Sequence, residues 1–103
     1  MISVYYGGGE DTLTLTAAAG SSSTKSVVTI TGNTAGGKLV YKGDYANATT
    51  AAAAVNVGDD VSAFTDFPST GEVTTASGKY IAVAVSVGGK AVASGVVAAV
   101  VGS

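Results

Sequence analysis

Short runs of alternating apolar and polar residues, separated by clusters of Gly, Ser, Asn and Asp, cover almost the whole chain. Alternation with a period of two places successive side chains on opposite faces of a β-strand, and short strands between frequent turn signals are typical of a small sandwich or barrel. We therefore expect an all-β fold, a small antiparallel β-sandwich or barrel of immunoglobulin-like size with about seven or eight short strands. A single β domain over residues 1–103 is expected at this length.

The clearest predicted element is a hairpin near the C-terminus. Large apolar residues recur at every second position of its first strand and are expected to share one buried face: Ile81, Val83, Val85 and Val87. Gly88 and Gly89 suit a two-residue type I′ turn, after which residues 90–94 are expected to return antiparallel. The intervening residues are small or apolar, so both faces should be covered, either within the fold or by another subunit. Four later valines also need burial: Val96, Val97, Val100 and Val101.

Earlier runs predict further strands and one ambiguous segment. Strands are expected at residues 2–6, 12–16, 26–31 and 38–42. The last two of these flank a Gly-rich connection and are expected to pair as a hairpin. Residues 44–57 are ambiguous, because their alanines favour a helix that Asn47 would cap, whereas their Thr and Val residues favour a strand. Since alanines bury little surface on a helix face, a strand or extended loop is preferred. A turn is expected around Pro68.

The composition removes most catalytic chemistry. The chain contains no His, Cys, Arg or Trp, and Ala, Val, Gly, Thr and Ser fill 73 of its 103 positions. Without His or Cys there is no ordinary general base near neutral pH, no thiolate nucleophile and no imidazole or thiolate metal ligand. We therefore expect a protein that is not an enzyme, that needs no cofactor and that has no disulfide framework.

Charged residues are also scarce. They form 12% of the chain, against about 25% in average globular proteins, and the net charge is −2. A surface of this kind repels copies of itself weakly, so a homo-oligomer is expected. Five lysines and no arginine, against seven carboxylates, argue against a nucleic-acid partner. The apolar stretch 91–101 is shorter than a membrane-crossing helix and residues 1–6 lack the pattern of a signal peptide, so no membrane partner is expected.

Carboxylates are the first candidate site. Asp59, Asp60 and Asp66 offer the oxygen ligands that Ca²⁺ prefers, but their spacing does not match an EF-hand loop, and no metal is expected there. Glu10 and Asp11 are adjacent, as are Asp59 and Asp60. Neighbouring residues on a strand point to opposite faces and in loops are usually solvated turn formers, so neither pair predicts a catalytic dyad.

Two further polar segments resemble catalytic or binding sequences only in part. Residues 7–9 are three glycines, but no Gly-Lys-Ser/Thr sequence follows them, and a phosphate loop is not expected. Residues 21–23 are serines whose only nearby base is Lys25. No catalytic, cofactor-binding or metal-binding residue is therefore assigned, and the sequence does not identify the residues that bind a partner.

One segment carries a family resemblance. Residues 9–17, GEDTLTLTA, resemble the opening of small phage head-decoration, or cement, proteins, and the Val/Ala/Gly/Thr-rich remainder is similar in composition to phage head-fibre and other virion surface proteins. The resemblance implies a non-enzymatic β domain in the virion that binds a capsid lattice as a trimer or another symmetric oligomer, without a cofactor. No binding residue is carried over, because none matches a family motif position by position.

Two alternatives share this composition. The first is an extracellular carbohydrate-binding or adhesive β-sandwich, in which a planar cluster of Tyr41, Tyr45 and Tyr80 would form the binding platform. The second is a self-assembling extracellular filament subunit, which would exchange strands between neighbours rather than close into an oligomer. Of the three, a capsid decoration or head-fibre protein is the function that we expect.

Overall fold

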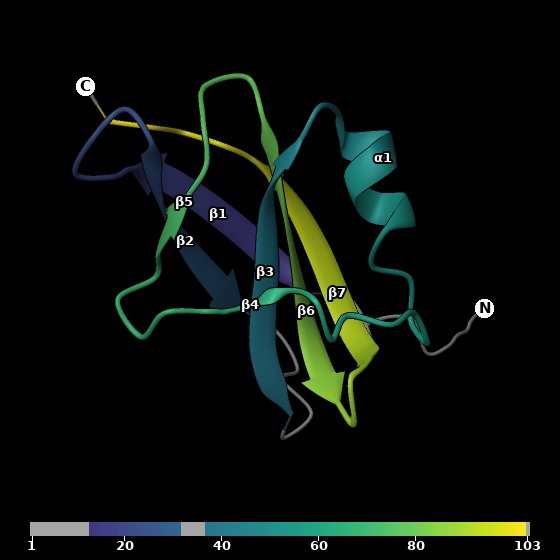
Figure 1. Cartoon of the computed structure of the whole chain (residues 1–103). Helices are drawn as coiled ribbons and strands as arrows, with labels where there is room; N and C mark the ends of the chain where they lie inside the picture. Colours follow the sequence, from purple (N-terminus) through teal and green to yellow (C-terminus); the bar gives the residue numbers. More distant parts are fainter. Residues whose placement is uncertain (1–12, 32–36, 103) are drawn as a thin grey trace.

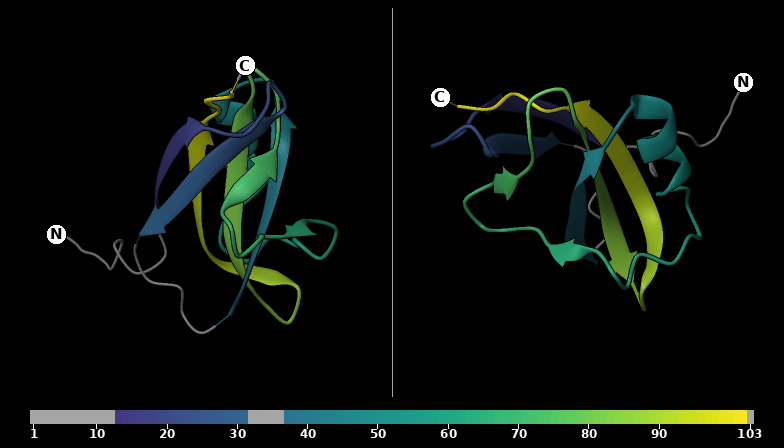
Figure 2. Two further views of the ribbon diagram at one scale, coloured as in Figure 1. Left: turned by 90° about the vertical axis from the view of Figure 1, so that its left-hand side faces the viewer. Right: turned by 45° about the horizontal axis from the view of Figure 1, so that its top comes forward.

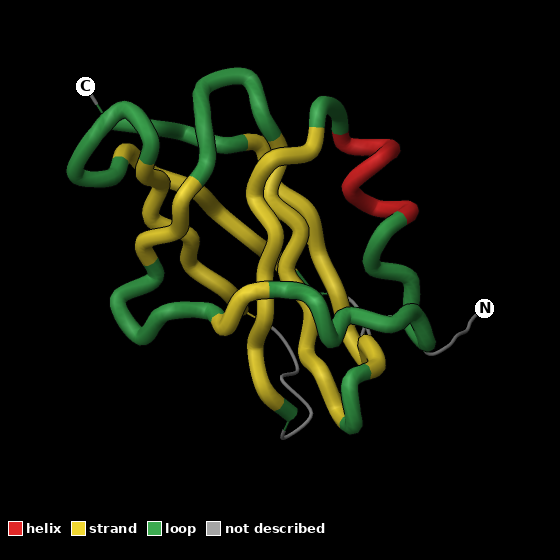
Figure 3. The backbone as a smooth tube through the Cα atoms, in the orientation of Figure 1, coloured by secondary structure: helices red, strands yellow, loops and turns green. Residues whose placement is uncertain are grey.

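The computed structural model describes residues 13–31 and 37–102, and these residues form two antiparallel sheets and one short helix (Figure 1). The three-stranded sheet has the order β1-β2-β5 and consists of β1 (Thr14–Ala19), β2 (Lys25–Thr31) and β5 (Glu72–Thr74). The four-stranded sheet has the order β4-β3-β6-β7 and consists of β4 (Thr65–Asp66), β3 (Lys38–Tyr45), β6 (Tyr80–Val87) and β7 (Lys90–Ala98). Strands dominate the trace (Figure 3), and the predicted all-β sandwich is confirmed.

β6 is the centre of the fold, and both of its faces are buried. Its odd-numbered residues have no exposed surface and pack toward the three-stranded sheet: Ile81, Val83 and Val85. On its other face Ala82 and Ala84 lie against a second apolar cluster, which includes Val55 and Val61. Each buried valine contributes about 1.5–3 kcal/mol of hydrophobic free energy. The second face of the predicted hairpin is therefore covered by this chain itself, through the helix α1 (Ala48–Ala53) and the loop that follows it (Figure 2).

The predicted turn between β6 and β7 is confirmed. Gly88 and Gly89 have φ angles of 62° and 84°, and Val87 pairs with Lys90 across them. A type I′ turn needs positive φ at both central positions, which glycine adopts without steric cost. The return strand is longer than predicted and continues to Ala98.

One residue of the predicted buried face is exposed. Val87 is 51% exposed, although it lies on the same side of β6 as Val85. A Cβ atom added to Gly37 would lie 2.6 Å from Val85 Cγ1 and 2.8 Å from Val87 Cγ2, so both side chains point toward Gly37. Val87 is the last residue of the strand and lies beyond the core cluster, so the buried face ends at Val85.

The hairpin predicted from residues 26–31 and 38–42 is wrong. β2 and β3 lie in different sheets and do not pair. β2 instead pairs with β1, and β3 pairs with β6, where Leu39 is opposite Val85. Alternation determines which face of a strand is apolar, but it carries no information about which strand is the neighbour.

The preference for a strand or loop within residues 44–57 is also wrong, because the helix α1 forms there. Asn47 caps it, accepting a hydrogen bond at Oδ1 from the Thr50 backbone N–H over 2.8 Å. Ala51 is fully buried and Val55 is 1% exposed, one helical turn apart. The small alanine side chain lets the helix pack closely on the outside of the four-stranded sheet, so a face with little apolar area is still sufficient.

The last valines are covered largely within the chain. Val96 packs on the helix side of the sheet and Val97 on the sandwich side, whereas Val100 is 45% exposed. The C-terminal segment then crosses the end of the sandwich, where the Val100 N–H donates to the Oγ of the fully buried Ser26 over 3.3 Å. The predicted strand at residues 2–6 lies outside the described residues.

Candidate functional site

The outer face of the three-stranded sheet is the most distinctive surface of the described chain. Alternation along β1 and β2 turns their threonines away from the core, and the register pairs Thr14 with Thr31 and Thr16 with Thr29. We call the following exposed or half-buried residues the threonine face: Thr14, Thr16, Ala18, Val27, Thr29, Thr31 and Thr74. Each threonine offers a methyl group and a hydroxyl that donates and accepts hydrogen bonds. The face can therefore contact a protein surface without displacing the water of charged groups.

The charges beside the threonine face are held at one end of it. The Lys25 Nζ donates to Thr74 Oγ1 over 2.9 Å, and Glu72 Oε2 accepts from the Ser21 backbone N–H over 2.7 Å. Lys25 thus bonds to a threonine rather than activating a serine, and Ser22 Oγ lies 3.2 Å from Thr24 Oγ1. None of these contacts joins a serine hydroxyl of residues 21–23 to a basic side chain.

β1 is an edge strand of this sheet. Gly20 donates its N–H to the Lys25 carbonyl, so the even-numbered residues of β1 direct their backbone groups toward β2. The odd-numbered residues direct theirs away from β2, which explains why the Leu13 N–H reaches the Ser94 carbonyl of β7 over 2.8 Å. Beyond that contact the outward backbone groups have no backbone partner among the described residues: those of Leu15, Ala17 and Ala19.

The three carboxylates of the hypothetical calcium site are used separately. Asp59 Oδ2 accepts from the Asn56 N–H over 3.0 Å, and Asp66 Oδ1 lies 3.0 Å from Lys38 Nζ. Asp60 Oδ1 accepts from the Ser62 N–H over 2.9 Å, and hydrogen bonds from Ser62 lower the pKa of the Asp60 carboxyl. Within residues 13–31 and 37–102, no three Asp or Glu side chains lie close enough together to hold a metal ion.

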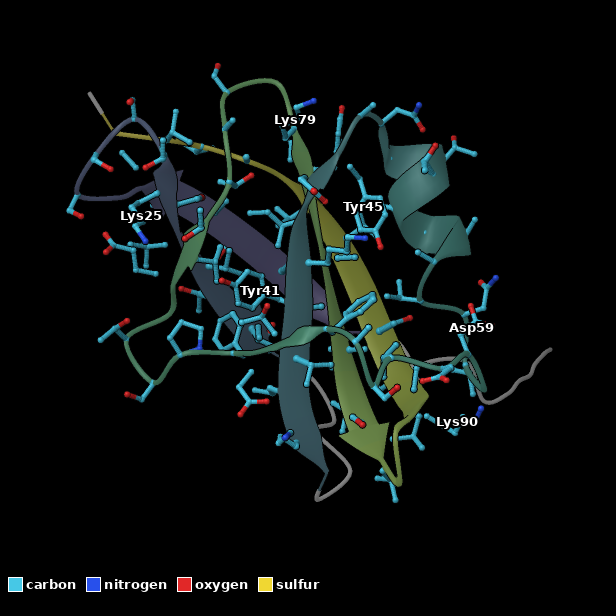
Figure 4. The ribbon with its side chains drawn as sticks, viewed as in Figure 1. Lys25, Tyr41, Tyr45, Asp59, Lys79 and Lys90 are labelled. Atoms are coloured by element: carbon cyan, nitrogen blue, oxygen red, sulfur yellow. The ribbon has the colours of Figure 1, made fainter. Side chains whose placement is uncertain are left out.

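The three tyrosines do not form one platform. Tyr41 packs on the sandwich side of the sheet, where its ring meets Phe67 edge to face with 6.1 Å between centroids. Tyr45 and Tyr80 pack on the opposite side, against the cluster under α1. Figure 4 shows Tyr41 and Tyr45 on opposite sides of β3. Lys42 lies over the Tyr45 ring at 5.4 Å from its centroid.

A shallow groove of about 360 Å³ lies between β3 and the β6–β7 turn. Phe64 and Gly89 line it, and the Lys38–Asp66 ion pair closes one side. The two side chains of this pair are 65% and 74% exposed, so the pair contributes little free energy to the fold. No sequence pattern indicates this groove, since its walls come from segments that meet only in the folded chain.

No family model, curated protein or solved structure matches the chain. In the part of the chain that the structure describes, no helix is long and apolar enough to cross a bilayer. The site is therefore characterised by its own geometry. Its main feature is the threonine face, with Lys25 and Glu72 held at one end.

Proposed function

We propose that this protein is a non-enzymatic structural protein that assembles on a repeated protein surface, and that it decorates a viral capsid as a symmetric homo-oligomer. The observation that carries the proposal is the threonine face. A sheet that exposes hydroxyl and methyl groups, with Lys25 and Glu72 held at one end, loses less hydration free energy when a partner covers it than a charged surface would, because its hydroxyls can exchange hydrogen bonds with the partner.

The capsid is the sharper part of the proposal, and it rests on the resemblance of residues 9–17. In the described part of that segment, residues 14–17 form the start of β1 and contribute Thr14 and Thr16 to the threonine face. Two residues of the segment that carries the resemblance therefore lie on the surface that is best suited to docking. The protein would accordingly be located in the virion.

Co-sedimentation with capsid shells tests the proposal. The purified chain is mixed with shells assembled from the major capsid protein encoded in the same genome, and the bound amount should saturate at a fixed ratio to the capsid subunits. Thr29→Lys, in the middle of the threonine face, should weaken binding at least about tenfold, because a buried lysine must lose water without gaining a partner. Ala53→Lys, at the exposed end of α1, is the matched control and should bind normally.

A chain that does not bind such shells would contradict the capsid function. Equal binding by the Thr29→Lys and Ala53→Lys variants would instead show that another surface docks. The alternative of a carbohydrate-binding sandwich loses its expected platform, since Tyr41 lies on the other side of the sheet from Tyr45 and Tyr80.

A further inference from the structure

We infer that the groove between β3 and the β6–β7 turn is a binding site for a neutral polyhydroxylated ligand, namely one sugar ring of a saccharide. The described residues that line the groove come from three segments, which are β3, residues 61–66 and the end of the β6–β7 hairpin. Its volume of about 360 Å³ lies at the lower end of the range of small-molecule sites. The inference goes beyond the proposed docking function and does not depend on it.

The groove lies on the outer face of the four-stranded sheet. Lys38 pairs with Ser86 and Val40 pairs with Ala84, so these four side chains share the face that carries the apolar cluster under α1. The threonine face is the outer face of the other sheet, and the two surfaces therefore lie on opposite sides of the sandwich. A molecule that docks through its threonine face keeps the groove directed away from that partner.

The segment 61–66 forms one wall of the groove and is fixed at both ends. The Val61 N–H donates to the Gly89 carbonyl over 2.9 Å, and Asp66 pairs with Val40 of β3. Because β4 lies on the far side of β3 from β6, the segment crosses the outer face of both strands. Phe64 lies between the two attachments, is half-buried and packs against the cluster that contains Val61. The wall is thus in place before a ligand binds, which avoids the entropic cost of ordering it.

The polar groups of the groove match the hydroxyls of a sugar. Lys38 Nζ lies 3.0 Å from Asp66 Oδ1, and both the ammonium group and the carboxylate have hydrogen-bonding capacity beyond this one contact. Two neighbouring hydroxyls can accept from the ammonium group and donate to the carboxylate. Ser62 and Ser86 add two hydroxyls to the lining, and Phe64 adds an apolar surface for the C–H groups of the ring.

The same lining disfavours other classes of ligand. It contains one lysine and one carboxylate, which are paired with each other, so it has no excess positive charge for a phosphate or another anion. One carboxylate is too few for a metal ion, which takes several oxygen ligands. A lipid chain would cover the serine hydroxyls and the ion pair without offering them hydrogen bonds. A neutral ligand that carries both hydroxyls and C–H groups satisfies the whole lining.

Titration of the isotopically labelled full-length chain, followed by its amide chemical shifts, tests the inference. The probes are the methyl glycosides of glucose, galactose, mannose and N-acetylglucosamine. At least one of them should bind with a Kd of about 1–10 mM, as expected for so small a ligand. The largest shifts should fall on residues 61–66 and 86–89. Glycerol, which has hydroxyls but no ring, and inorganic phosphate should bind more weakly than that glycoside.

Variants of the lining should weaken the binding. Phe64→Leu keeps an apolar side chain but removes the aromatic ring, and it should raise the Kd about fivefold. Lys38→Gln removes the ammonium group from an exposed position without disturbing the core, and it should raise the Kd at least about threefold. Lys42→Gln is the matched control, because Lys42 lies on the same face of β3 but outside the groove. Thr29→Lys, which alters the threonine face, should also bind the glycoside normally, so the sugar site and the capsid function can fail separately.

Three results would overturn the inference. The first is that no glycoside gives saturating shifts in residues 61–66 and 86–89 at concentrations well above the expected Kd. The second is that phosphate or glycerol binds as tightly as the best glycoside, which would indicate an anion site or unspecific contact. The third is that Lys38→Gln binds as well as Lys42→Gln, which would place the ligand elsewhere. This last comparison needs only exposed residues, so it decides the question even where Phe64→Leu fails to fold.

Discussion

The hydroxyl of Thr75 donates a hydrogen bond to the backbone carbonyl of Gly43, and this bond joins the two sheets. Thr75 follows β5 and donates its own N–H to the Thr24 carbonyl over 2.9 Å, whereas Gly43 lies in β3 at the point where its pairing with β6 becomes irregular. Thr75 is 7% exposed, so water does not readily replace the bond. The bond therefore gives the Gly43 carbonyl a buried donor from the other sheet.

Replacing this hydroxyl should destabilise the fold. Thr75→Val keeps the shape of the side chain but leaves the Gly43 carbonyl without its donor, which should cost about 1–3 kcal/mol in the free energy of unfolding. Urea denaturation measures the loss. Thr74→Val, on the exposed side of β5, should change stability by less than about 0.5 kcal/mol. Equal effects of the two substitutions would contradict this role of Thr75.

A charge at Val85 should abolish folding. This residue has no exposed surface and lies in the core between the sheets, so Val85→Asp would place an unpaired charge out of water at a cost of several kcal/mol. Val87→Asp is the matched control, because Val87 lies on the same side of the same strand but is 51% exposed. Circular dichroism should show a folded Val87→Asp variant and an unfolded Val85→Asp variant. A folded Val85→Asp protein would show that the register of β6 is wrong.

Loss of the Asn47 cap should weaken α1. Asn47→Ala removes the acceptor of the Thr50 N–H, and loss of such a cap costs about 0.5–2 kcal/mol. Asn56→Ala serves as the control, since it is the Asn56 backbone N–H that bonds, to Asp59 Oδ2. Thermal unfolding of both variants measures the difference. A stable Asn47→Ala protein would mean that packing of Ala51 and Val55 alone holds the helix.

Alkaline pH should destabilise the protein through Tyr45. Burial raises the pKa of the Tyr45 hydroxyl above its ordinary value of 10.0, and the Asp44 carboxylate adds to this effect. The folded state thus holds this proton more tightly than the unfolded state, so the contribution to stability is present below pH 10 and is lost as the pH rises above it. Urea denaturation at pH 9 and pH 11 should show a smaller loss for Tyr45→Phe than for wild type. Tyr41→Phe, which keeps Tyr45, should retain the loss.

Chelators should not affect assembly. Asp59, Asp60 and Asp66 have separate partners in the folded chain, and each partner is a backbone N–H or a lysine. We expect the solution mass and capsid binding to be unchanged by EDTA. Binding that disappears with EDTA and returns with Ca²⁺ would require these carboxylates to rearrange and would contradict the expectation.

The parts of the fold that could be predicted are those determined by neighbours in sequence. Gly88 and Gly89 determine a turn by their backbone freedom, and the alternation beside them determines which residues of β6 face the core. The pairing of Leu39 with Val85 depends instead on which sheet β3 joins, and no local pattern records that choice. The preference for a strand over the helix α1 is wrong because the burial of the helix depends on how closely Ala51 approaches β6, not on how much apolar surface the helix carries.

The candidate site could likewise be predicted only in part from the sequence. The absence of charge between Thr14 and Ala19 is visible in the sequence. That this stretch forms an edge strand, and that Thr29 and Thr31 extend its exposed face, follow only from the sheet order. Tyr41 and Tyr45 lie on opposite sides of the sheet because the register of β3 shifts between Lys42 and Tyr45. The residue types in this segment do not indicate that shift.

The central position of β6 has a consequence for the rate of folding. Its pairing with β7 is local and closes through the Gly88–Gly89 turn, which is the kind of unit that forms in about 1–10 μs. Its other neighbour is β3, where the paired residues Lys38 and Ser86 are separated in sequence by nearly half of the chain. Leu13 and Ser94, which share a backbone hydrogen bond, are separated by most of the chain. Chains dominated by such distant pairings fold in milliseconds to seconds. The β6–β7 hairpin is therefore expected to form first, and its apolar surface stays exposed until β3 pairs with β6. The newly synthesised chain is most vulnerable to aggregation in that interval.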